Sequence, residues 1–587
     1  MKDRRCFAGA RLLRLVLAGV ALATVTSTML IGQEVPEDAQ TPTGAPVTVR
    51  GVVLNASTGQ PLRRALVKVS GQELGALTDG EGRFEIHGVP GGVENLEAVK
   101  PGFQELRNSD DPGFFSGHVV RVASDMPDLS FSLAPKNAIF GRLTLSTGTP
   151  ALGIGLTLLR QRIDDGRAGW EEADRHETTP DGAFRFAGLR DGTYLLTTQP
   201  EFDNDHAGEL SCHADAPAEM SGYAPVFYGD AHEMGGAARI VVTGGQSAEV
   251  NLGLNLTKFH LVEAALARAP AGGNWEFSNM LLNNSGQDVE YPVHEEKNHT
   301  LCTYLPDGAY MLAVGASRDG EAQPRGDVGP QRGTNTGELT GLIEFSVDGQ
   351  AVRNLRVPLA QVVSTPIHLR YEPRPPAPAK AIRQIGEEEE EENGADLVDI
   401  SATRVIAVSG KGDARAEATE SSETTYELET VSPGAYWIHA NASRKGVCIG
   451  SASAAGQNLA RSPWTAGTSG AGAPIDLVVR TDCANLTVQM PLTLPAESSG
   501  EGATWYVYAI PEFDSIASVS KGQIEQFGDR TATLEDMAPG TYRVFAFQSP
   551  QSIEFRNPAV LDRLGAGEEV TLEPGGKANL VLEAISR

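Results

Sequence analysis

The stretch Phe184-Arg-Phe-Ala-Gly-Leu-Arg-Asp-Gly192-Thr-Tyr194 is the clearest copy of a segment that occurs five times in this chain of 587 residues. The other copies are Phe84-Glu-Ile-His-Gly-Val-Pro-Gly-Gly92, Leu305-Pro-Asp-Gly308-Ala-Tyr310, Val431-Ser-Pro-Gly434-Ala-Tyr436 and Met537-Ala-Pro-Gly540-Thr-Tyr542. Each copy reads as a short apolar strand, a tight turn with Gly, and a second strand. The turn glycines are 100, 116, 126 and 106 residues apart, which is the length of a β-sandwich domain, whereas solenoids repeat every roughly 20–50 residues.

A strand of alternating character closes each repeat. Its predicted inward residues are Leu129/Phe131/Leu133, Val250/Leu252/Leu254, Leu355/Val357/Leu359, Ile475/Leu477/Val479 and Leu580/Leu582. Alternation with a period of two indicates one buried and one wet face, as in antiparallel sandwich sheets. In four copies a Tyr stands two residues after the turn glycine, and we expect it to bury its ring while its hydroxyl reaches the rim, like a corner tyrosine. The sequence therefore predicts an all-β chain of about five antiparallel β-sandwiches.

The repeats predict the following domains. They are a signal segment (1–32), a linker (33–45), sandwich 1 (46–136), sandwich 2 (137–256, with an insertion at 201–236), sandwich 3 (257–360), sandwich 4 (361–482, with an acidic Pro/Glu-rich insertion at 371–396) and sandwich 5 (483–587). Like charges in the run Glu387–Glu392 repel one another, so we expect a solvated loop there.

The first repeat resembles a known family. The stretches Val49-Arg-Gly-Val-Val-Leu, Gly59-Gln-Pro-Leu-Arg-Arg-Ala-Leu-Val-Lys-Val and Thr78-Asp-Gly-Glu-Gly-Arg-Phe84 are similar to those of carboxypeptidase regulatory-like domains, which are transthyretin-like sandwiches related to Cna-B-like domains. The second repeat echoes them, and the whole chain resembles exported multi-repeat proteins of environmental bacteria such as acidobacteria. The resemblance implies an accessory module beside other domains. No residues are left over for a catalytic domain, so we expect no enzyme activity.

The N-terminus has the layout of a secretory signal. Five basic residues precede a mostly apolar run at residues 15–31. These basic residues are Lys2, Arg4, Arg5, Arg11 and Arg14. The cleavage site is not evident, so an uncleaved anchor stays an alternative. The net charge of −28 argues against binding to nucleic acid or anionic lipid. We expect an extracytoplasmic protein with no other membrane span, whose partner is a protein or an envelope component, with polysaccharide as an alternative.

Four cysteines follow the signal segment: Cys212, Cys302, Cys448 and Cys483. An exported chain with four cysteines allows two disulfides in three pairings. The pair Cys448–Cys483 is favoured because Cys483 falls just past the closing strand of the repeat that contains Cys448. The pair Cys212–Cys302 follows by elimination.

Metal and cofactor chemistry has little support in the sequence. The pair His206-Ala-Gly-Glu209, with Cys212-His213 behind it, has zinc-ligand spacing but lies in the polar insertion of the second repeat. A zinc peptidase is therefore only a remote alternative, and we expect no metal, no cofactor and no catalytic residue.

Carbohydrate binding is the main alternative to a structural or interaction role, because starch-binding modules share this kind of sandwich. Sugars stack on exposed aromatic rings. The candidates for stacking are Trp170, Tyr223, Phe227, Tyr228 and Trp464. Aromatic residues are only 6% of the chain, which favours a non-catalytic structural or interaction protein over an array of carbohydrate-binding modules.

Overall fold

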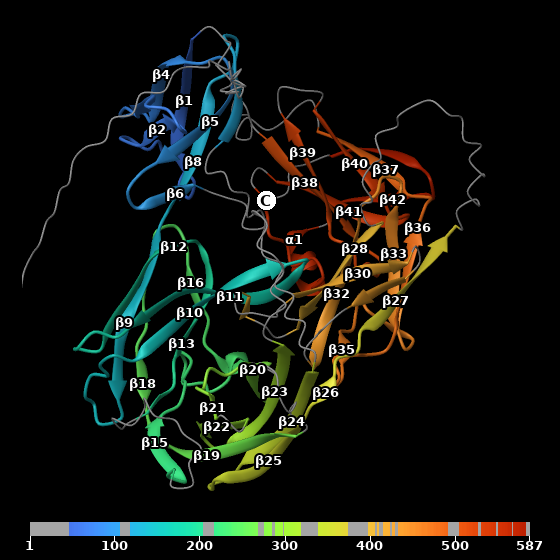
Figure 1. The fold of residues 1–587 in the computed structure, drawn as a ribbon. Helices are drawn as coiled ribbons and strands as arrows, with labels where there is room; N and C mark the ends of the chain where they lie inside the picture. The colour runs from blue at the N-terminus through green and yellow to red at the C-terminus, as the bar shows by residue number, and fades with distance from the viewer. Residues whose placement is uncertain are drawn as a thin grey trace, which may run out of the picture.

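The computed structural model describes residues 46–582, with gaps at residues 106–117, 203–215, 268–274, 285–287, 297–298, 319–338, 374–396, 406–407, 410–414, 423–424, 429–432, 491–503, 526–529, 548–549 and 566. The described chain is mostly β-strand, with one α-helix, α1 (Pro558–Leu564), and one 3-10 helix, η1 (Met234–Gly236). Its strands form five β-sandwiches, coloured from blue to red along the chain in Figure 1. The predicted fold class is confirmed.

The signal segment, the linker and the acidic run Glu387–Glu392 lie outside the described residues. In the part that is described, no helix has the length and the hydropathy needed to cross a membrane.

Sandwich 1 consists of two four-stranded sheets, with orders β4-β1-β8-β6 and β3-β2-β5-β7. Its strands are β1 (Val47–Asn55), β2 (Leu66–Val69), β3 (Gly75–Leu77), β4 (Arg83–Val89), β5 (Gly92–Val99), β6 (Phe103–Glu105), β7 (His118–Val122) and β8 (Leu129–Pro135). Val53, Val67 and Leu96 are buried between the sheets with Phe84 and Phe131.

Sandwich 2 contains a sheet of order β16-β13-β10-β11-β29 and a sheet of order β12-β9-β17, in which β18 also pairs with β9. Its own strands are β9 (Asn137–Leu145), β10 (Gly155–Asp164), β11 (Arg167–Glu177), β12 (Ala183–Leu189), β13 (Gly192–Thr198), β16 (Ile240–Val242), β17 (Ser247–Glu249) and β18 (Leu252–Leu254). Strand β29 (Val408–Ser409) comes from the chain of sandwich 4, so hydrogen bonds between strands connect these two distant repeats.

Sandwich 3 contains a sheet of order β14-β15-β19-β22-β21, in which β25 also pairs with β19, and a sheet of order β20-β23-β24-β26. Its strands are β14 (Glu201–Phe202), β15 (Glu219–Tyr223), β19 (Leu256–Ala267), β20 (Trp275–Asn283), β21 (His294–Glu295), β22 (Thr300–Leu305), β23 (Gly308–Arg318), β24 (Leu339–Val347), β25 (Val352–Pro358) and β26 (Ala360–Gln361).

The sequence predicts that the insertion at 201–236 belongs to sandwich 2. In the structure it does not belong to sandwich 2 alone, because β14 and β15 extend the sheet of sandwich 3. The physical reason is that Phe202 and Met220 bury their side chains against Phe259 and Tyr304 of sandwich 3. After β15 the chain returns to sandwich 2, where the Val226 amide donates to Thr198 Oγ1 at 2.9 Å. The insertion therefore connects the two sandwiches.

In sandwich 4 a single run of pairings joins both layers, in the order β34-β33-β36-β27-β31-β30-β28-β32-β35. The strands besides β29 are β27 (Thr365–Glu372), β28 (Val398–Arg404), β30 (Arg415–Ser422), β31 (Thr425–Leu428), β32 (Gly434–Ala442), β33 (Cys448–Ala454), β34 (Gln457–Asn458), β35 (Trp464–Ala466) and β36 (Ile475–Arg480). Sandwich 5 consists of two sheets, with the strand orders β40-β37-β43 and β39-β38-β41-β42. Its strands are β37 (Ala484–Gln489), β38 (Thr504–Pro511), β39 (Ser520–Glu525), β40 (Thr531–Met537), β41 (Gly540–Phe547), β42 (Glu568–Leu572) and β43 (Lys577–Val581).

In each sandwich the opening strand pairs in parallel with the strand or strands that close the sandwich. The pairs are β1 with β8, β9 with β17 and β18, β19 with β25, β27 with β36, and β37 with β43. The sequence predicts antiparallel sheets and misses these pairs. They arise because the chain crosses to the other sheet and returns before it lays down the closing strand, and such a crossover permits parallel neighbours.

The closing strands bury most of the residues predicted to face inward, whereas Leu129, Leu355 and Leu580 are only partly buried. Phe131, Leu254, Val357, Leu477 and Leu582 are all buried, one in each sandwich. Alternation with a period of two was therefore a sound guide to the core-facing side of these strands.

Three of the four tyrosines after the turn glycines are corner tyrosines, as predicted. Tyr194 Oη donates to the Arg190 carbonyl at 2.8 Å, Tyr310 Oη to the Pro306 carbonyl at 3.0 Å, and Tyr542 Oη to the Ala538 carbonyl at 2.7 Å. Burial raises the pKa of all three hydroxyls, so each stays protonated and donates its hydrogen bond. The bond spans four residues and fixes the turn against the strand.

Replacing Tyr542→Phe is expected to lower the free energy of unfolding of sandwich 5 by about 1 kcal/mol, because the buried Ala538 carbonyl loses its donor. Urea denaturation followed by tryptophan fluorescence measures the change, since Trp505 is in the core of this sandwich. Tyr506→Phe is the matched control, because Tyr506 Oη makes no hydrogen bond with any described residue. Equal losses in both variants would contradict the role of the corner.

Candidate functional site

The predicted metal pair cannot be placed. His206, Glu209, Cys212 and His213 lie outside the described residues. Among the residues that the structure does describe, no group of three or more His, Cys, Asp or Glu side chains is placed to hold a metal ion.

Cys448 and Cys483 form a disulfide with a Cα–Cα distance of 5.8 Å, which is the pairing that the sequence favours. It ties the first residue of β33 to the residue just before β37 and so fixes the connection from sandwich 4 to sandwich 5. Cys302 is also disulfide-bonded, and its predicted partner Cys212 lies outside the described residues.

The aromatic residues predicted to stack on sugars are in or against the cores. Trp464 is only 2% exposed, and its Nε1 donates to the Ala473 carbonyl at 2.9 Å. The stacking role predicted for Trp464 is therefore wrong, because its ring faces are packed inside sandwich 4. A strand as short as β35 does not reveal from its sequence which of its faces is buried.

The other four aromatic candidates pack against sandwich 2, although Tyr223 is the last residue of β15 in the sheet of sandwich 3. Phe227 is buried beside Leu159, and Trp170 packs half-buried against the same cluster. Tyr223 and Tyr228 are half-buried against the main core of sandwich 2. The structure thus uses these side chains in packing, with Phe227 buried and the other three partly exposed.

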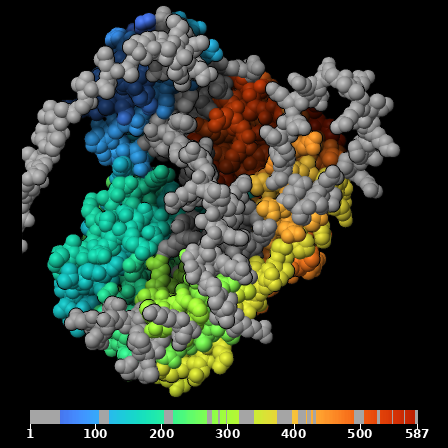
Figure 2. Space-filling view, in the orientation of Figure 1, coloured from blue at the N-terminus to red at the C-terminus, as the bar shows by residue number. Residues whose placement is uncertain are grey.

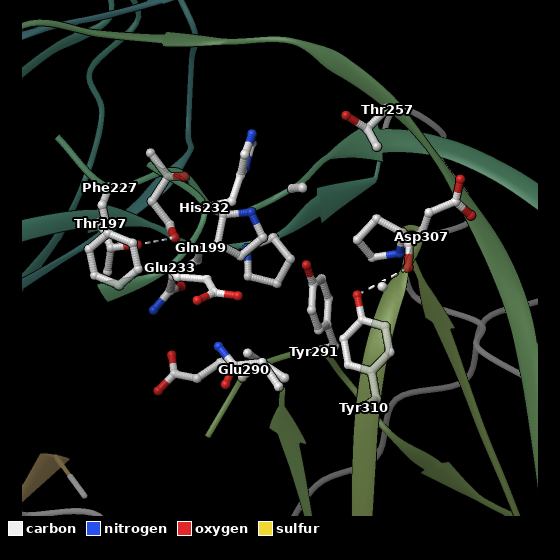
Figure 3. Close-up of a pocket in the computed structure, with 18 of the residues that line it drawn as sticks. Thr197, Gln199, Phe227, His232, Glu233, Thr257, Glu290, Tyr291, Asp307 and Tyr310 are labelled. Atoms are coloured by element: carbon white, nitrogen blue, oxygen red, sulfur yellow. Dashed lines mark hydrogen bonds between the residues drawn. The ribbon is translucent and has the colours of Figure 1, made fainter. Parts of the chain in front are cut away.

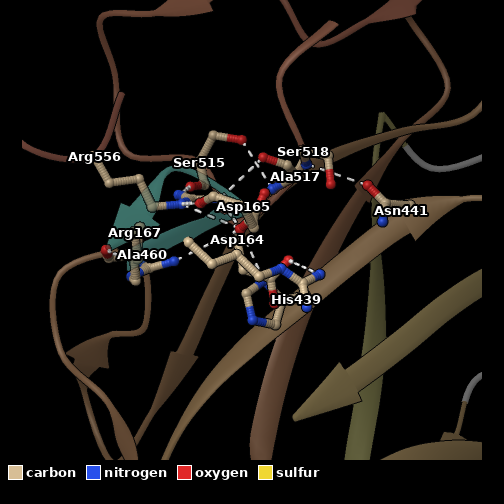
Figure 4. A network of polar contacts seen from close by, with 11 residues as sticks. Asp164, Asp165, Arg167, His439, Asn441, Ala460, Ser515, Ala517, Ser518 and Arg556 are labelled. Carbon is tan, nitrogen blue, oxygen red and sulfur yellow. Dashed lines mark hydrogen bonds and ion pairs between the residues drawn. The ribbon is translucent and has the colours of Figure 1, made fainter. Parts of the chain in front are cut away.

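The tip of the β10–β11 hairpin is the most elaborate polar site of the described chain. Asp165 and Gly166 form the turn with φ angles of 44° and 74°. A Cβ on Gly166 would lie 2.4 Å from the ring of Phe555, so only glycine fits between the turn and sandwich 5. The tip is held between sandwiches 4 and 5, as Figure 4 shows.

Asp165 is the centre of this junction. Its Oδ2 accepts from Arg556 Nη2 at 2.6 Å and from His439 Nδ1 at 2.8 Å. Arg556 Nε donates to the Asp165 carbonyl at 2.8 Å, and Arg556 also donates to the carbonyls of Ser515 and Ala517. The side chains of Asp165, Arg556 and His439 are 9%, 10% and 12% exposed, so water screens their interaction little.

Burial acts to raise the pKa of Asp165, but the hydrogen bond from His439 and the charge of Arg556 outweigh it and hold the pKa below its ordinary value. The carboxylate is therefore ionised at neutral pH. A buried charge of this kind is tolerated only where it is paired and hydrogen-bonded, as Asp165 is.

Arg167 extends the same junction. Its guanidinium lies 3.9 Å from the ring centroid of Trp437, and its Nη2 donates to the Ala460 carbonyl at 3.1 Å. Burial, together with the charge of Arg556, lowers the pKa of Arg167 to about 10, so the group stays charged at neutral pH. The stacking of a guanidinium on Trp holds the hairpin against sandwich 4.

Sequence reasoning did not find this junction. Asp165 is 274 residues from His439 and 391 residues from Arg556. The stretch Asp164-Asp-Gly-Arg167 carries only the signal of a hairpin turn. Nothing in the sequence marks this turn as one that packs against other repeats.

A cleft of about 740 Å³ lies where sandwich 2 meets sandwich 3. Figure 3 shows that Thr197, Gln199, Phe227, His232 and Glu233 line it on the side of sandwich 2. The residues of sandwich 3 shown opposite are Thr257, Glu290, Tyr291, Asp307 and Tyr310. Of the predicted site residues that the structure describes, only Phe227 lines this cleft.

Comparison with known proteins supports the resemblance seen in the first repeat. Residues 48–119 match the family model of the carboxypeptidase regulatory-like domain. The predicted resemblance of sandwich 1 is therefore confirmed. No curated protein matches the chain.

Several solved structures are similar at low identity. The Bacillus anthracis TIE protein matches at 12% identity and a TM-score of 0.16, over 54% of this chain and 51% of that one, so the match spans about half of that protein. The minor pilin GBS52 of Streptococcus agalactiae matches at 15% identity and a TM-score of 0.18, over 38% of this chain and 100% of that one. Two B repeat units of the collagen-binding protein of Staphylococcus aureus match at 10% identity and a TM-score of 0.12, over 70% and 92% of the two chains. No conclusion about this chain depends on scores this low.

Proposed function

We propose that this chain is a non-catalytic, extracytoplasmic interaction protein, in which sandwiches 2–5 form one frame that carries sandwich 1. The observation that carries this proposal is the junction at Asp165, which joins three sandwiches that are far apart in the sequence. A flexible string of domains would not bury an ion pair between distant members, because ordering the chain would cost too much entropy. The buried network serves to hold sandwiches together.

Sandwich 1 is the part of the chain that the frame leaves available for contact. It forms the blue end of the molecule beside sandwich 2 (Figure 2). Its outer sheet face carries a row of cross-strand neighbours, Leu77, Leu66 and Val99, of which Leu77 is 59% exposed. Exposed apolar rows of this kind are typical of protein contacts. A protein partner therefore fits this face better than a polysaccharide, which needs flat aromatic rings.

A photo-activatable cross-linking amino acid placed at Leu77 tests the proposal in the cells that produce the protein. We expect ultraviolet-dependent adducts with a protein of the cell envelope. The control is the same group at Glu81, which is also exposed on sandwich 1 but lies in the turn before β4 and outside the row. Equal adducts from both positions, or none from Leu77, would contradict a specific contact at this row.

A further inference from the structure

The cleft between sandwiches 2 and 3 has the size of a binding site. Its volume of about 740 Å³ falls within the range of roughly 300–1,000 Å³ that is common for ligand pockets. The insertion that crosses between the two sandwiches supplies part of its wall, including Phe227, His232 and Glu233. Because both sandwiches contribute walls, a ligand here would contact the frame at one of its internal boundaries.

The charge of the cleft is strongly one-sided. Five carboxylates line it: Glu219, Glu233, Asp288, Glu290 and Asp307. Lys258 is the one lysine or arginine among the described lining residues, and its Nζ is 2.7 Å from Glu219 Oε1. Arg175, from outside the lining, forms an ion pair with Glu290 at 3.5 Å, so five carboxylates share two nearby lysine and arginine side chains among the described residues. A cleft lined by one sign of charge concentrates its field, so this one attracts cations and repels anions.

Tyr291 adds a specific polar group to this field. Its hydroxyl points into the cleft in Figure 3 and makes no hydrogen bond with any residue that the structure describes. Its ring is held in place edge-to-face against Phe259, with the centroids 6.0 Å apart. Burial, reinforced by Tyr310, raises the pKa of Tyr291, so the hydroxyl remains neutral and can accept from a cationic N–H group or donate to a carbonyl.

Amide groups supply the remaining chemistry. Gln199 of sandwich 2 and Asn283 of sandwich 3 line the same cleft. Side-chain amides both donate and accept, as the backbone of an extended peptide requires. Because Gln199 Nε2 already donates to Thr157 Oγ1 at 3.4 Å, the carboxylates are the main groups that the lining offers to a ligand.

We propose that this cleft binds a lysine- or arginine-bearing segment of a partner protein, with the cationic side chain placed among Glu233, Glu290 and Tyr291. This site is separate from the apolar row of sandwich 1, and its occupant is defined by charge. Anionic peptides are excluded by the same field. A neutral glycan, which would use the amides and hydroxyls without the charge, is the competing occupant.

Calorimetric titration of the full chain tests this site with three probes: Ac-Gly-Lys-Gly-Lys-Gly-NH2, the same peptide with Glu in place of Lys, and maltohexaose. We expect the lysine peptide to bind with one-to-one stoichiometry, and its affinity to fall as salt is added. The glutamate peptide and the glycan should give no heat of binding. Absence of lysine-peptide binding at millimolar concentrations, or binding of the glycan in its place, would overturn the proposal.

Charge-neutral variants locate the binding. The double variant Glu233→Gln/Glu290→Gln is expected to lower the affinity for the lysine peptide at least tenfold. Tyr291→Phe is expected to lower this affinity a few-fold. The matched control is Glu568→Gln/Glu569→Gln, which removes the same charge from β42 of sandwich 5. An equal loss in the control would show diffuse attraction by an acidic protein and would refute the site. Unchanged melting temperatures show that the variants are folded, and cross-linking from Leu77 should be unaffected by them, so the two proposals fail independently.

Discussion

Replacing Asp165→Asn is expected to release the tip of the β10–β11 hairpin from sandwiches 4 and 5. The change leaves Arg556 and Arg167 without their carboxylate in a site that water scarcely reaches. Removing one partner of a buried ion pair costs about 3–5 kcal/mol. Hydrogen–deuterium exchange measures the effect, because the hairpin amides should exchange roughly 100-fold faster or more once the closed junction is destabilised by that amount.

The neighbouring Asp164→Asn is the matched control for this experiment. This substitution removes the same charge from the same hairpin. The side chain of Asp164 is exposed, however, and its Oδ1 lies 3.9 Å from Arg162 Nη2. We expect exchange in this variant to be unchanged. If both variants exchange alike, the junction does not hold the sandwiches together.

The same carboxylate gives the junction a defined dependence on pH. The pKa of Asp165 is lower in the closed junction than in an exposed aspartate, because the hydrogen bond from His439 and the charge of Arg556 outweigh the opposing effect of burial. A lowered pKa stabilises the closed state above the ordinary carboxyl pKa of about 4, and this stabilisation is lost as the pH falls through the lower value. The protection of the hairpin amides, measured as the exchange rate relative to the intrinsic rate at the same pH, should therefore fall in acid in the natural protein, and Asp165→Asn should lack this contribution.

Removing the disulfide with Cys448→Ala/Cys483→Ala is expected to lower the free energy of unfolding by about 4 kcal/mol, because the bond closes a loop with a sequence separation of 35 residues. Urea denaturation without reductant measures the loss. Ser451→Ala, an exposed change in the same strand β33, is the control and should have little effect. A loss below about 1 kcal/mol would mean that strand pairing alone fixes the connection.

The same bond reports on export. In the cells that produce the protein, deletion of residues 2–32 should leave Cys448 and Cys483 as free thiols, because disulfides are rare in a reducing cytoplasm. Alkylation followed by mass spectrometry distinguishes the two states. Full oxidation of the deleted form would contradict the role proposed for the N-terminal segment.

The sequence predicts those parts of the fold that depend on residues close together in the chain. The turn with its glycine and corner tyrosine is a property of a few adjacent residues, as at Gly540 and Tyr542, and the alternation of Leu477 with its neighbours is a property of one strand. The turn and the alternating strand occur five times and the tyrosine four times, so each copy supports the others. Pairing direction is not local, and the parallel pairs of opening and closing strands were missed for that reason.

The junction and the cleft are singular features, and no repeat supports them. His439 and Arg556 carry no sign in the sequence that a turn from sandwich 2 will reach them. The cleft depends on β14 and β15 extending the sheet of the next sandwich, which no pattern within sandwich 2 indicates. Trp464 illustrates the same limit at the level of one side chain, because its burial is decided by the partner sheet.

The parallel pairing of β1 with β8 has a mechanical consequence. Because the two strands run the same way, the chain enters each sandwich at one end of the pair and leaves at the other. A pull on the two ends would load the ladder from Gly51 to Asn55 in shear, so its hydrogen bonds would have to break together and could not open one after another. In sandwiches 2–5 such a pull would also have to break the contacts of the Asp165 turn with Arg556 and His439. This arrangement makes the chain suited to resisting tension between its ends.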